Sequence, residues 1–271
     1  MQTADNLNDL PFQDKMENTK LPVIATLTTS PTRIHKMYKT LKSIQGQTRA
    51  PDRIIVNLPY VFQRTGETYQ VPRFFEEFPN LYVNWVDVDY GPATKLIPTL
   101  ALVNTEAYLW VVDDDQDYLS RELAFLLSCA EDNKVETAYC LSGLKMTKNG
   151  VIKEAKDRGT VDIFEAYAGV LLKRSMFEDD FYHYMGICIA EQNCRISDDL
   201  IISLYLQAKG YPIEKVGSIM VNQWLHWKLG GVLDYGDGSD ALHNAGDGFT
   251  IKRYKTAYPI AMQILYSTVR K

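Results

Sequence analysis

Three consecutive carboxylates form the densest group of chemically capable side chains in this sequence. Asp113, Asp114 and Asp115 follow the apolar run 109–112 without a break. Three adjacent negative charges repel one another, and a hard cation such as Mg²⁺ or Mn²⁺, which prefers carboxylate oxygens, relieves that repulsion. At the carboxyl end of a strand, the cluster would lie where open α/β sheets bind their ligands. The pattern therefore predicts a divalent-metal site that holds phosphates; the alternatives are a solvated acidic turn and a surface Ca²⁺ loop.

A second acidic pair, Asp198 and Asp199, follows Ser197 at the predicted start of a helix. Carboxylates at a helix N-terminus complement the helix dipole, and this alone is a sufficient structural explanation. One carboxylate could instead cap the helix while the other accepts a proton from a substrate hydroxyl. The dipole would lower the pKa of such a base and the neighbouring carboxylate would raise it. The residues alone leave both roles open.

Four further residues are candidates for binding, each with a structural alternative. His243, in a glycine-rich stretch, could complete a metal shell with a neutral imidazole, although a lone histidine is more often structural. Arg33 and Lys95 each follow a predicted strand and could meet a phosphate or a base, or be surface charges. Gly169 could let the backbone approach a ligand closely, or could mark a tight strand crossing.

The elements that must position these residues alternate between strand and helix. An apolar run at 23–29, helical spacing over 35–45 and a second apolar run at 53–58 predict a β-α-β unit with a right-handed parallel crossover. We expect further strands at 82–88, 109–112, 137–142 and 169–173, and helices at 95–103, 120–130, 200–209 and 251–268, with Ser120 as an N-cap. This order predicts an α/β fold with a mostly parallel sheet flanked by helices.

Composition narrows the class of protein. The 271 residues are 46% hydrophobic and 23% charged, which supports a sizeable core. We expect one domain over 21–271, with a polar N-terminal arm at 1–20 and an irregular C-terminal lobe at 217–271. A net charge of −5 without a basic stripe argues against a nucleic-acid partner.

The sequence also lacks signals for membranes, disulfides and two common nucleotide motifs. No apolar run approaches the roughly 18 residues of a membrane span, and 1–20 lacks a signal-peptide core. The four cysteines form no C-x-x-C pair, so we expect buried thiols in a reducing compartment and a cytoplasmic protein, free or peripheral to a membrane. Neither G-x-x-x-x-G-K-[ST] nor G-x-G-x-x-G is present, which argues against a P-loop NTPase and a Rossmann dehydrogenase.

Five stretches, in this order, resemble the GT-A-fold, metal-dependent glycosyltransferases, and more narrowly a family-2-like group of polysaccharide-building systems and large viruses. They include a strand-end Asp-x-Asp, a later Gly-Val strand and an Asp-Asp at a helix start. The resemblance spans about residues 22–215. The matching stretches are 27–34 (Leu-Thr-Thr-Ser-Pro-Thr-Arg-Ile), 89–96 (Asp-Tyr-Gly-Pro-Ala-Thr-Lys-Leu), 112–115 (Val-Asp-Asp-Asp), 161–170 (Val-Asp-Ile-Phe-Glu-Ala-Tyr-Ala-Gly-Val) and 197–200 (Ser-Asp-Asp-Leu).

The resemblance implies a role for each candidate. It makes Asp115 a metal ligand and places Asp113 near both the metal and the ribose. It assigns nucleotide binding to the loops after the early strands and to the rest of the acidic cluster. It assigns catalysis to the pair Asp198 and Asp199 at the helix start. The substrate-binding residues are then Thr28, Arg33, Lys95, Asp113, Asp114 and Gly169. The catalytic pair is Asp199, as base, and Asp198, which stands where the family usually has Glu. His243, in preference to His226, completes the metal shell.

The implied function is a glycosyltransferase that uses Mn²⁺ or Mg²⁺. It would move a sugar from a nucleotide-diphosphate sugar, a UDP-sugar first, to a hydroxyl of a glycan or lipid-linked glycan, with inversion. Trp224, Trp227 and Tyr235 are candidates to stack on the acceptor, or core residues. Two alternatives remain: a sugar nucleotidyltransferase, which would need a glycine-rich loop after the first strand, and a non-catalytic metal-dependent carbohydrate-binding module.

Overall fold

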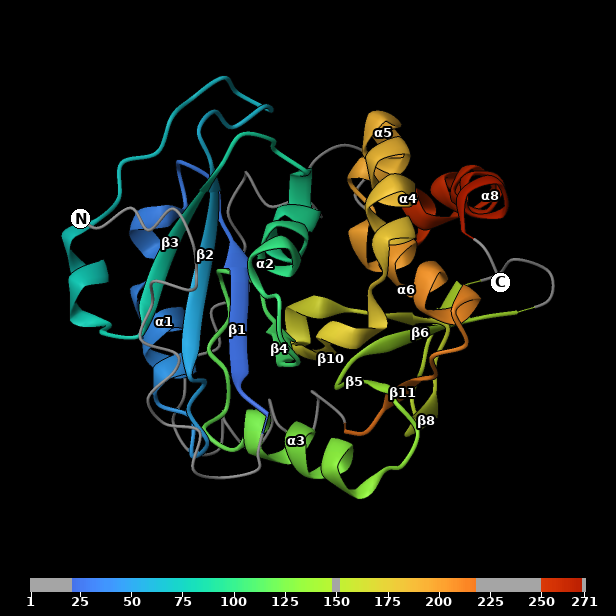
Figure 1. Ribbon diagram of the computed structural model, residues 1–271, viewed down its shortest axis with the longest axis horizontal. Helices are drawn as coiled ribbons and strands as arrows, with labels where there is room; N and C mark the ends of the chain where they lie inside the picture. The colour runs from blue at the N-terminus through green and yellow to red at the C-terminus, as the bar shows by residue number, and fades with distance from the viewer. Residues whose placement is uncertain (1–20, 148–151, 218–249, 270–271) are drawn as a thin grey trace.

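The computed structural model describes residues 21–147, 152–217 and 250–269, and shows the predicted α/β fold (Figure 1). Its main sheet has eight strands in the order β3-β2-β1-β4-β10-β5-β11-β8, and a small second sheet has the order β7-β6-β9. The strands are β1 (Val23–Thr28), β2 (Arg53–Pro59), β3 (Leu81–Val86), β4 (Tyr108–Val111), β5 (Ala138–Cys140), β6 (Gly143–Met146), β7 (Ile152–Glu154), β8 (Gly159–Thr160), β9 (Ile163–Phe164), β10 (Val170–Lys173) and β11 (Ile213–Lys215).

Helices flank this sheet. The α-helices are α1 (Tyr38–Gln45), α2 (Ile97–Leu102), α3 (Glu122–Asp132), α4 (Asp179–Ala190), α5 (Gln192–Arg195), α6 (Asp198–Ala208) and α8 (Thr250–Thr268). Short 3₁₀ turns are η2 (Ile34–Lys36), η3 (Arg73–Glu77), η4 (Gly91–Lys95), η5 (Ala166–Ala168) and η6 (Arg174–Met176). Within the described ranges, no helix is both long and apolar enough to cross a membrane.

The main sheet is mostly parallel, as predicted. Strands β1, β2, β3 and β4 pair in parallel, and β5 pairs in parallel with β11. Only β10, between β4 and β5, and the edge strand β8 run the other way. Six of the eight strands therefore end at the same edge of the sheet.

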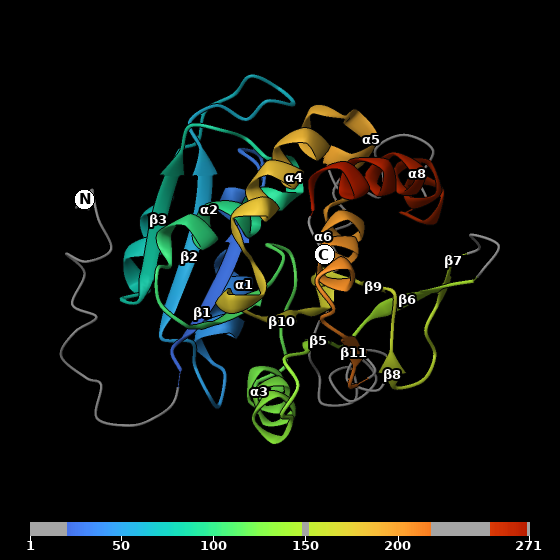
Figure 2. The same ribbon diagram turned by 45° about the vertical axis from the view of Figure 1, so that its right-hand side comes forward.

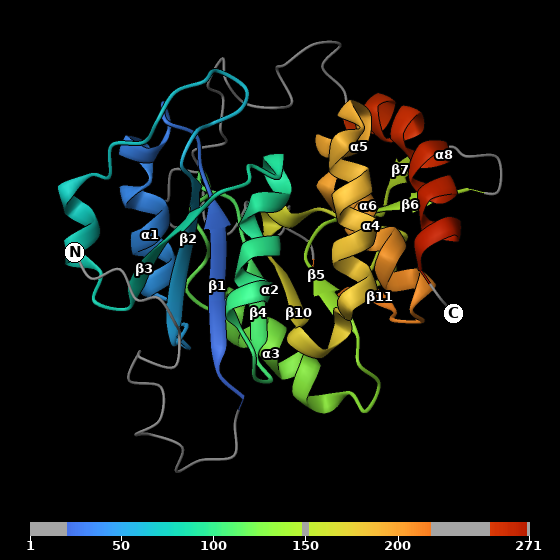
Figure 3. The ribbon, with the colours of Figure 1, turned by 45° about the horizontal axis from the view of Figure 1, so that its top comes forward.

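Alternating side chains of the central strands fill two separate cores. On β1, Val23, Ala25 and Leu27 pack with α1 and α3, while Ile24 packs on the opposite face with α2 and the later helices. Because neighbouring side chains of a strand point to opposite faces, one apolar run serves both layers. Figure 3 shows α2, α4 and α6 on one side of the strands.

The chain reverses its direction of travel across the sheet at β1. Strands β2 and β3 are added on one side of β1, and β4 is then added on the other side. In open α/β sheets such a reversal leaves a crevice outside the carboxyl ends of the two strands, where ligands bind. The loops after β1 and β4, which carry Arg33 and the 113–115 cluster, meet at this crevice.

Three long helices and α5 form a second wall beside the sheet. Helix α8 packs on α4, α5 and α6, and Figure 2 shows the four close together. The predicted helix at 200–209 is confirmed, but it begins earlier, at Asp198. It ends as expected at Gly210, whose φ is +83°, with Gly210 N–H bonded to Gln207 O and Tyr211 N–H to Leu206 O, a Schellman motif.

Two sequence expectations differ from the structure. Helix α3 starts after Arg121, so Ser120 is not its N-cap; the Ser120 carbonyl instead accepts a hydrogen bond from Thr48 N. Helix α4 was not predicted, although its buried Phe181, Tyr184, Met185 and Cys188 follow helical spacing. The expectation for the cysteines is confirmed in part: all four are free thiols, and all but Cys129 are buried.

Candidate functional site

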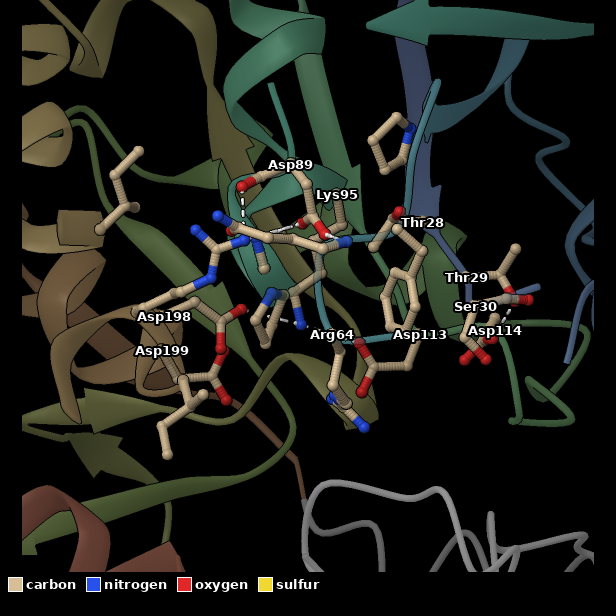
Figure 4. A pocket seen from close by; sticks show the side chains of 18 of the residues that line it. Thr28, Thr29, Ser30, Arg64, Asp89, Lys95, Asp113, Asp114, Asp198 and Asp199 are labelled. Atoms are coloured by element: carbon tan, nitrogen blue, oxygen red, sulfur yellow. Dashed lines mark hydrogen bonds and ion pairs between the residues drawn. The ribbon is translucent and has the colours of Figure 1, made fainter. Parts of the chain in front are cut away.

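A cleft of about 1090 Å³ opens at the carboxyl edge of the parallel strands. One wall is made by the segments that follow β1, β2, β3 and β4, and the other by α4, α5, the start of α6 and the start of α8. Figure 4 shows Asp113 and Lys95 in the middle of this cleft, with Asp198 and Asp199 on one side and Thr29, Ser30 and Asp114 on the other. The two predicted acidic groups thus share one cavity.

Lys95 joins the two acidic groups. Its Nζ lies 2.8 Å from Asp113 Oδ1 and 3.1 Å from Asp198 Oδ2. Burial alone would lower the pKa of Lys95, but the carboxylates of Asp113, Asp198 and Asp199 together raise it well above its ordinary value. Lys95 is therefore a permanent cation between the strand end and the helix start. Lys95 lines the cleft and is not a surface charge, and its role in substrate binding stays a prediction.

A buried polar network holds Lys95 in place from below. Thr26 donates a hydrogen bond to the Lys95 carbonyl, and the Thr26 and Thr99 hydroxyls lie 2.6 Å apart. Asn57 donates to Thr99 Oγ1 at 2.9 Å and accepts from Asn84 Nδ2 at 2.8 Å. A satisfied network of this kind fixes geometry, because breaking one bond leaves a buried polar group unpaired. Strands β1, β2 and β3 therefore position the cation that bridges the site.

Asp114 and Asp115 both meet Arg33, from the loop after β1. The guanidinium bonds Asp114 and lies 2.5 Å from Asp115 Oδ2, and Thr29 Oγ1 also donates to Asp114. Burial raises the pKa of Asp114 to about 7, an effect that Arg33 opposes and Asp115 strengthens. Arg33 thus pairs with Asp114 and Asp115, while Lys95 pairs with Asp113.

Asp199 has one bonded and one unbonded carboxylate oxygen and forms no ion pair with a described cation. Its Oδ2 accepts hydrogen bonds from Ala166 N at 3.3 Å and Tyr254 Oη at 3.5 Å, while its Oδ1 is buried and has no hydrogen-bond partner in the structure. Burial, and then the charge of Asp198, raise the pKa of Asp199 well above its ordinary value. No side chain caps helix α6, whose first two residues are this acidic pair. A carboxylate with a raised pKa and a free oxygen is suited to accept a proton.

The other predicted residues divide between the cleft and the interior. Thr28 lines the cleft and donates to Asn57 O at 2.8 Å, and Arg33 lines it beside the 113–115 cluster. Gly169 is not among the described residues that line the cleft; it has a φ of +79° and packs on Trp110 and Glu122. The lack of a side chain at Gly169 thus permits the close approach of Trp110 and Glu122 inside the protein. The substrate-binding role predicted for Gly169 is not supported.

Two carboxylates of the cluster are placed to meet a divalent cation. Asp113 and Asp115 line the cleft, and their side chains are 31% and 22% exposed. The described residues contain no group of three or more His, Cys, Asp or Glu that could hold a metal by themselves. Mg²⁺, however, is usually held by one or two carboxylates, substrate phosphates and water. Such a mode fits Asp113 and Asp115. A metal ion would compete with Lys95 for Asp113 and with Arg33 for Asp115.

Several predicted residues lie outside the described part of the chain. These are the metal-ligand candidate His243, its alternative His226, and the aromatic candidates Trp224, Trp227 and Tyr235. The predicted N-terminal arm at 1–20 and most of the C-terminal lobe lie outside it as well.

The structure adds residues that the sequence did not single out. Asp89 lies 3.2 Å from Arg195 Nη2 and accepts hydrogen bonds from Gly91 N and Gln63 N, at 2.7 and 2.8 Å. It thereby ties the loops after β2 and β3 to α5 across the cleft. Its position two residues before Gly91-Pro92, at the start of the matching stretch 89–96, was the available signal. Arg253 also lines the cleft, and nothing local in the sequence marks it.

No protein-family model matches this chain, and no curated protein matches its sequence. Among solved structures, the crystal structure of S. aureus TarS aligns with a TM-score of 0.46 and 14% identity, covering 73% of this chain and 35% of that chain. The crystal structure of S. aureus TarS 1–349 in complex with UDP aligns with a TM-score of 0.42 and 13% identity, covering 66% of this chain and 55% of that chain. This chain therefore spans between about a third and about half of those chains.

Proposed function

We propose that this protein is a GT-A-like glycosyltransferase that moves a sugar from a nucleotide-diphosphate sugar to an acceptor hydroxyl in glycan or polysaccharide synthesis. The observation that carries the proposal is the shared cleft. The strand-end Asp113–Asp115 cluster and the helix-start pair Asp198 and Asp199 face one cavity and are joined through Lys95. The order of motifs in the sequence and the strand reversal at β1 support the same reading.

The donor is assigned to the side of the cleft formed by β1 and β4. Asp113 and Asp115 would hold Mn²⁺ or Mg²⁺ together with the diphosphate of the donor. When bound, the metal supplies positive charge that stabilises the leaving diphosphate. Arg33 and Lys95 add fixed positive charge at the same edge, and Thr28 and the loop after β3 are placed to meet the nucleoside. UDP is the first nucleotide to test.

The acceptor is activated by Asp199. This carboxylate takes the proton of the acceptor hydroxyl, whose oxygen then attacks the anomeric carbon from the face opposite the leaving diphosphate. The configuration of the sugar is thereby inverted. Asp198 is held by Lys95, so it is less available as a proton acceptor and instead raises the pKa of its neighbour. The roles of the acidic pair are thus divided, with Asp199 as base and Asp198 as the charge that tunes it.

A binding and turnover experiment tests the proposal. UDP, GDP and other nucleoside diphosphates are titrated by calorimetry with and without Mn²⁺, and donor sugars are screened by released nucleoside diphosphate. We expect metal-dependent binding of one nucleotide, and its loss in Asp115→Ala. Asp199→Asn should keep nucleotide affinity but lose turnover by on the order of 10²–10⁴-fold, the usual contribution of a general base.

The same experiment separates the alternatives. A sugar nucleotidyltransferase would release pyrophosphate from a nucleoside triphosphate and a sugar phosphate. A carbohydrate-binding module would bind sugar without nucleotide. Absence of metal-dependent nucleotide binding in the intact protein would overturn the proposal.

A further inference from the structure

Arg253 is a cation of the cleft that forms no ion pair with a described carboxylate. Arg33, Lys95 and Arg195 each pair with an aspartate, at Asp115, Asp113 and Asp89 respectively. Arg253 lines the same cleft, yet no described carboxylate lies within ion-pairing distance of it, and its Nε is buried without a hydrogen-bond partner. Its guanidinium instead lies over the ring of Tyr254, 5.6 Å from the centroid. A buried N–H without a partner in the free protein is a natural position for a ligand group.

Arg253 lies beside the proposed base rather than beside the strand-end cluster. It is in the first turns of α8, a helix that packs on α4, α5 and α6. The adjacent Tyr254 hydroxyl bonds Asp199 Oδ2 at 3.5 Å. Since Asp199 is assigned to the acceptor, the neighbouring cation belongs to the acceptor side of the cleft.

A glycine on α4 leaves room on this side. Gly186 lines the cleft in the interior of the helix, and a Cβ built on it would meet no atom within 4 Å. Glycine destabilises a helix interior relative to alanine, so packing inside the protein gives no reason for it here. Ile189 and Ala190 lie one turn further along and also line the cleft. This part of α4 therefore presents small and apolar residues to open space in the cleft, as suits the carbon face of a sugar ring.

We propose that α4 and the start of α8 form the acceptor subsite, and that this subsite takes a glycan whose anionic group, a carboxylate or a phosphate, pairs with Arg253. The planar guanidinium matches either anion with two parallel hydrogen bonds. Gly186, Ile189 and Ala190 receive the rest of the sugar. This inference rests on the proposed function, because it takes Asp199 as the group that meets the acceptor.

Direct binding of small glycosides to the whole chain tests this subsite without requiring turnover. Methyl β-D-glucuronide, glucose 6-phosphate and the neutral methyl β-D-glucoside are titrated into the protein by NMR, with and without UDP and Mn²⁺. We expect one of the two anionic sugars to bind more tightly than the neutral one, and the two charged probes identify which anion is preferred. Arg253→Met should weaken that binding on the order of 10- to 100-fold, and Arg253→Lys should weaken it less.

Two further variants control for charge and space. Lys252→Met removes the same charge from the exposed neighbouring position of α8, outside the cleft lining, and should leave glycoside binding unchanged. Gly186→Leu places a bulky side chain in this open space and is a better helix former, so it should abolish glycoside binding without lowering the melting temperature. The second variant keeps the test decisive even where Arg253→Met disturbs the fold.

The outcomes distinguish this inference from the proposed function. Equal binding of charged and neutral glycosides, or an unchanged affinity in Arg253→Met, overturns the anionic acceptor. A loss of UDP affinity in Arg253→Met also overturns it, because the arginine would then serve the donor diphosphate. Arg253-dependent binding of an anionic sugar without any nucleotide binding would support the subsite and contradict the glycosyltransferase.

Discussion

At the scale of single residues, the cleft is organised by the distribution of its charges. Two cations of the donor side are each shared between two carboxylates: Lys95 between Asp113 and Asp198, and Arg33 between Asp114 and Asp115. No described cation forms an ion pair with Asp199, and its pKa rises through burial and through the charge of Asp198. Asp199 is thereby made more basic than an ordinary aspartate.

The first prediction concerns the pH dependence of turnover. Asp199 must be ionised to accept a proton, so kcat/KM should fall as the pH falls through its pKa. Because that pKa is raised, the midpoint of the acid limb should lie well above the ordinary Asp value of about 4. A pH profile of kcat/KM measures this midpoint.

Asp198→Asn provides the matched comparison. It removes the like charge beside Asp199, so the acid limb should move to lower pH in this variant. An acid limb that stays in place would show that another group titrates.

The second prediction concerns a buried glutamate behind the site. Burial raises the pKa of Glu122 to about 8 from an ordinary 4.5, so the folded protein holds a proton that the unfolded chain releases. The stability contributed by this proton is complete below about pH 4.5 and is lost as the pH rises to about 8. The free energy of unfolding should therefore fall across this range, by on the order of 3–5 kcal/mol for this group.

Urea unfolding of Glu122→Gln between pH 5 and 8.5 isolates this contribution. The glutamine keeps the shape of the side chain but does not titrate, so the decline with pH should be smaller than in the unaltered protein. Parallel pH curves for the two proteins would mean that Glu122 is ionised in the fold.

At the scale of elements, the antiparallel strand β10 closes the sheet beside the acidic cluster. It pairs with β4, and the turn that leads into it ends at Gly169. The left-handed φ of +79° at this glycine and its contacts with Trp110 and Glu122 let β10 approach β4 from the opposite direction. The element that carries Asp113 to Asp115 is thus fixed on both sides.

The third prediction tests this crossing. A Cβ at Gly169 would lie 2.8 Å from both Glu122 Oε1 and Trp110 Nε1, in addition to the backbone strain of a left-handed residue. Gly169→Ala should therefore lower the free energy of unfolding by about 2–4 kcal/mol. Gly210→Ala is the control: its φ is +83° but no atom lies within 4 Å of the added Cβ, so only about 1 kcal/mol should be lost. Equal losses in urea unfolding would rule out the predicted contact.

At the scale of the whole molecule, the cleft separates a sheet wall from a helical wall. The carboxyl ends of β1, β2 and β4 form one wall, and α4, α5, α6 and α8 form the other. The ion pairs Lys95–Asp198 and Arg195–Asp89 connect the two walls. A ligand that contacts both walls should therefore stabilise the whole fold.

The fourth prediction is a ligand-induced rise in melting temperature. A nucleoside diphosphate at about 100 times its Kd adds about 2.7 kcal/mol to the free energy of unfolding. For a chain of this size that corresponds to a rise of about 5–10 °C. Thermal unfolding with UDP and Mn²⁺ should show the rise, and EDTA or Asp115→Ala should remove it. A rise that persists under both treatments would contradict metal-dependent binding.

The sequence alone determined the longer strands, most of the longer helices and the positions of the two acidic groups. Apolar runs, helical spacing and adjacent carboxylates are local patterns, so they survive without knowledge of the fold. They predicted the mostly parallel sheet, the helix at Asp198 and the glycine that ends it. Helix α4 and the short strands were missed, although α4 carries a usable periodicity.

The tertiary structure decided how these groups are paired. It assigned Lys95 to both acidic groups and Arg33 to Asp114 and Asp115, moved Gly169 from the cleft to a strand crossing, and left Arg253 without a carboxylate among the described residues. The physical reason is that ion pairs and pKa values depend on distance and burial. Both are set by the strand order and by the reversal at β1, and neither is encoded in the spacing of residues along the chain.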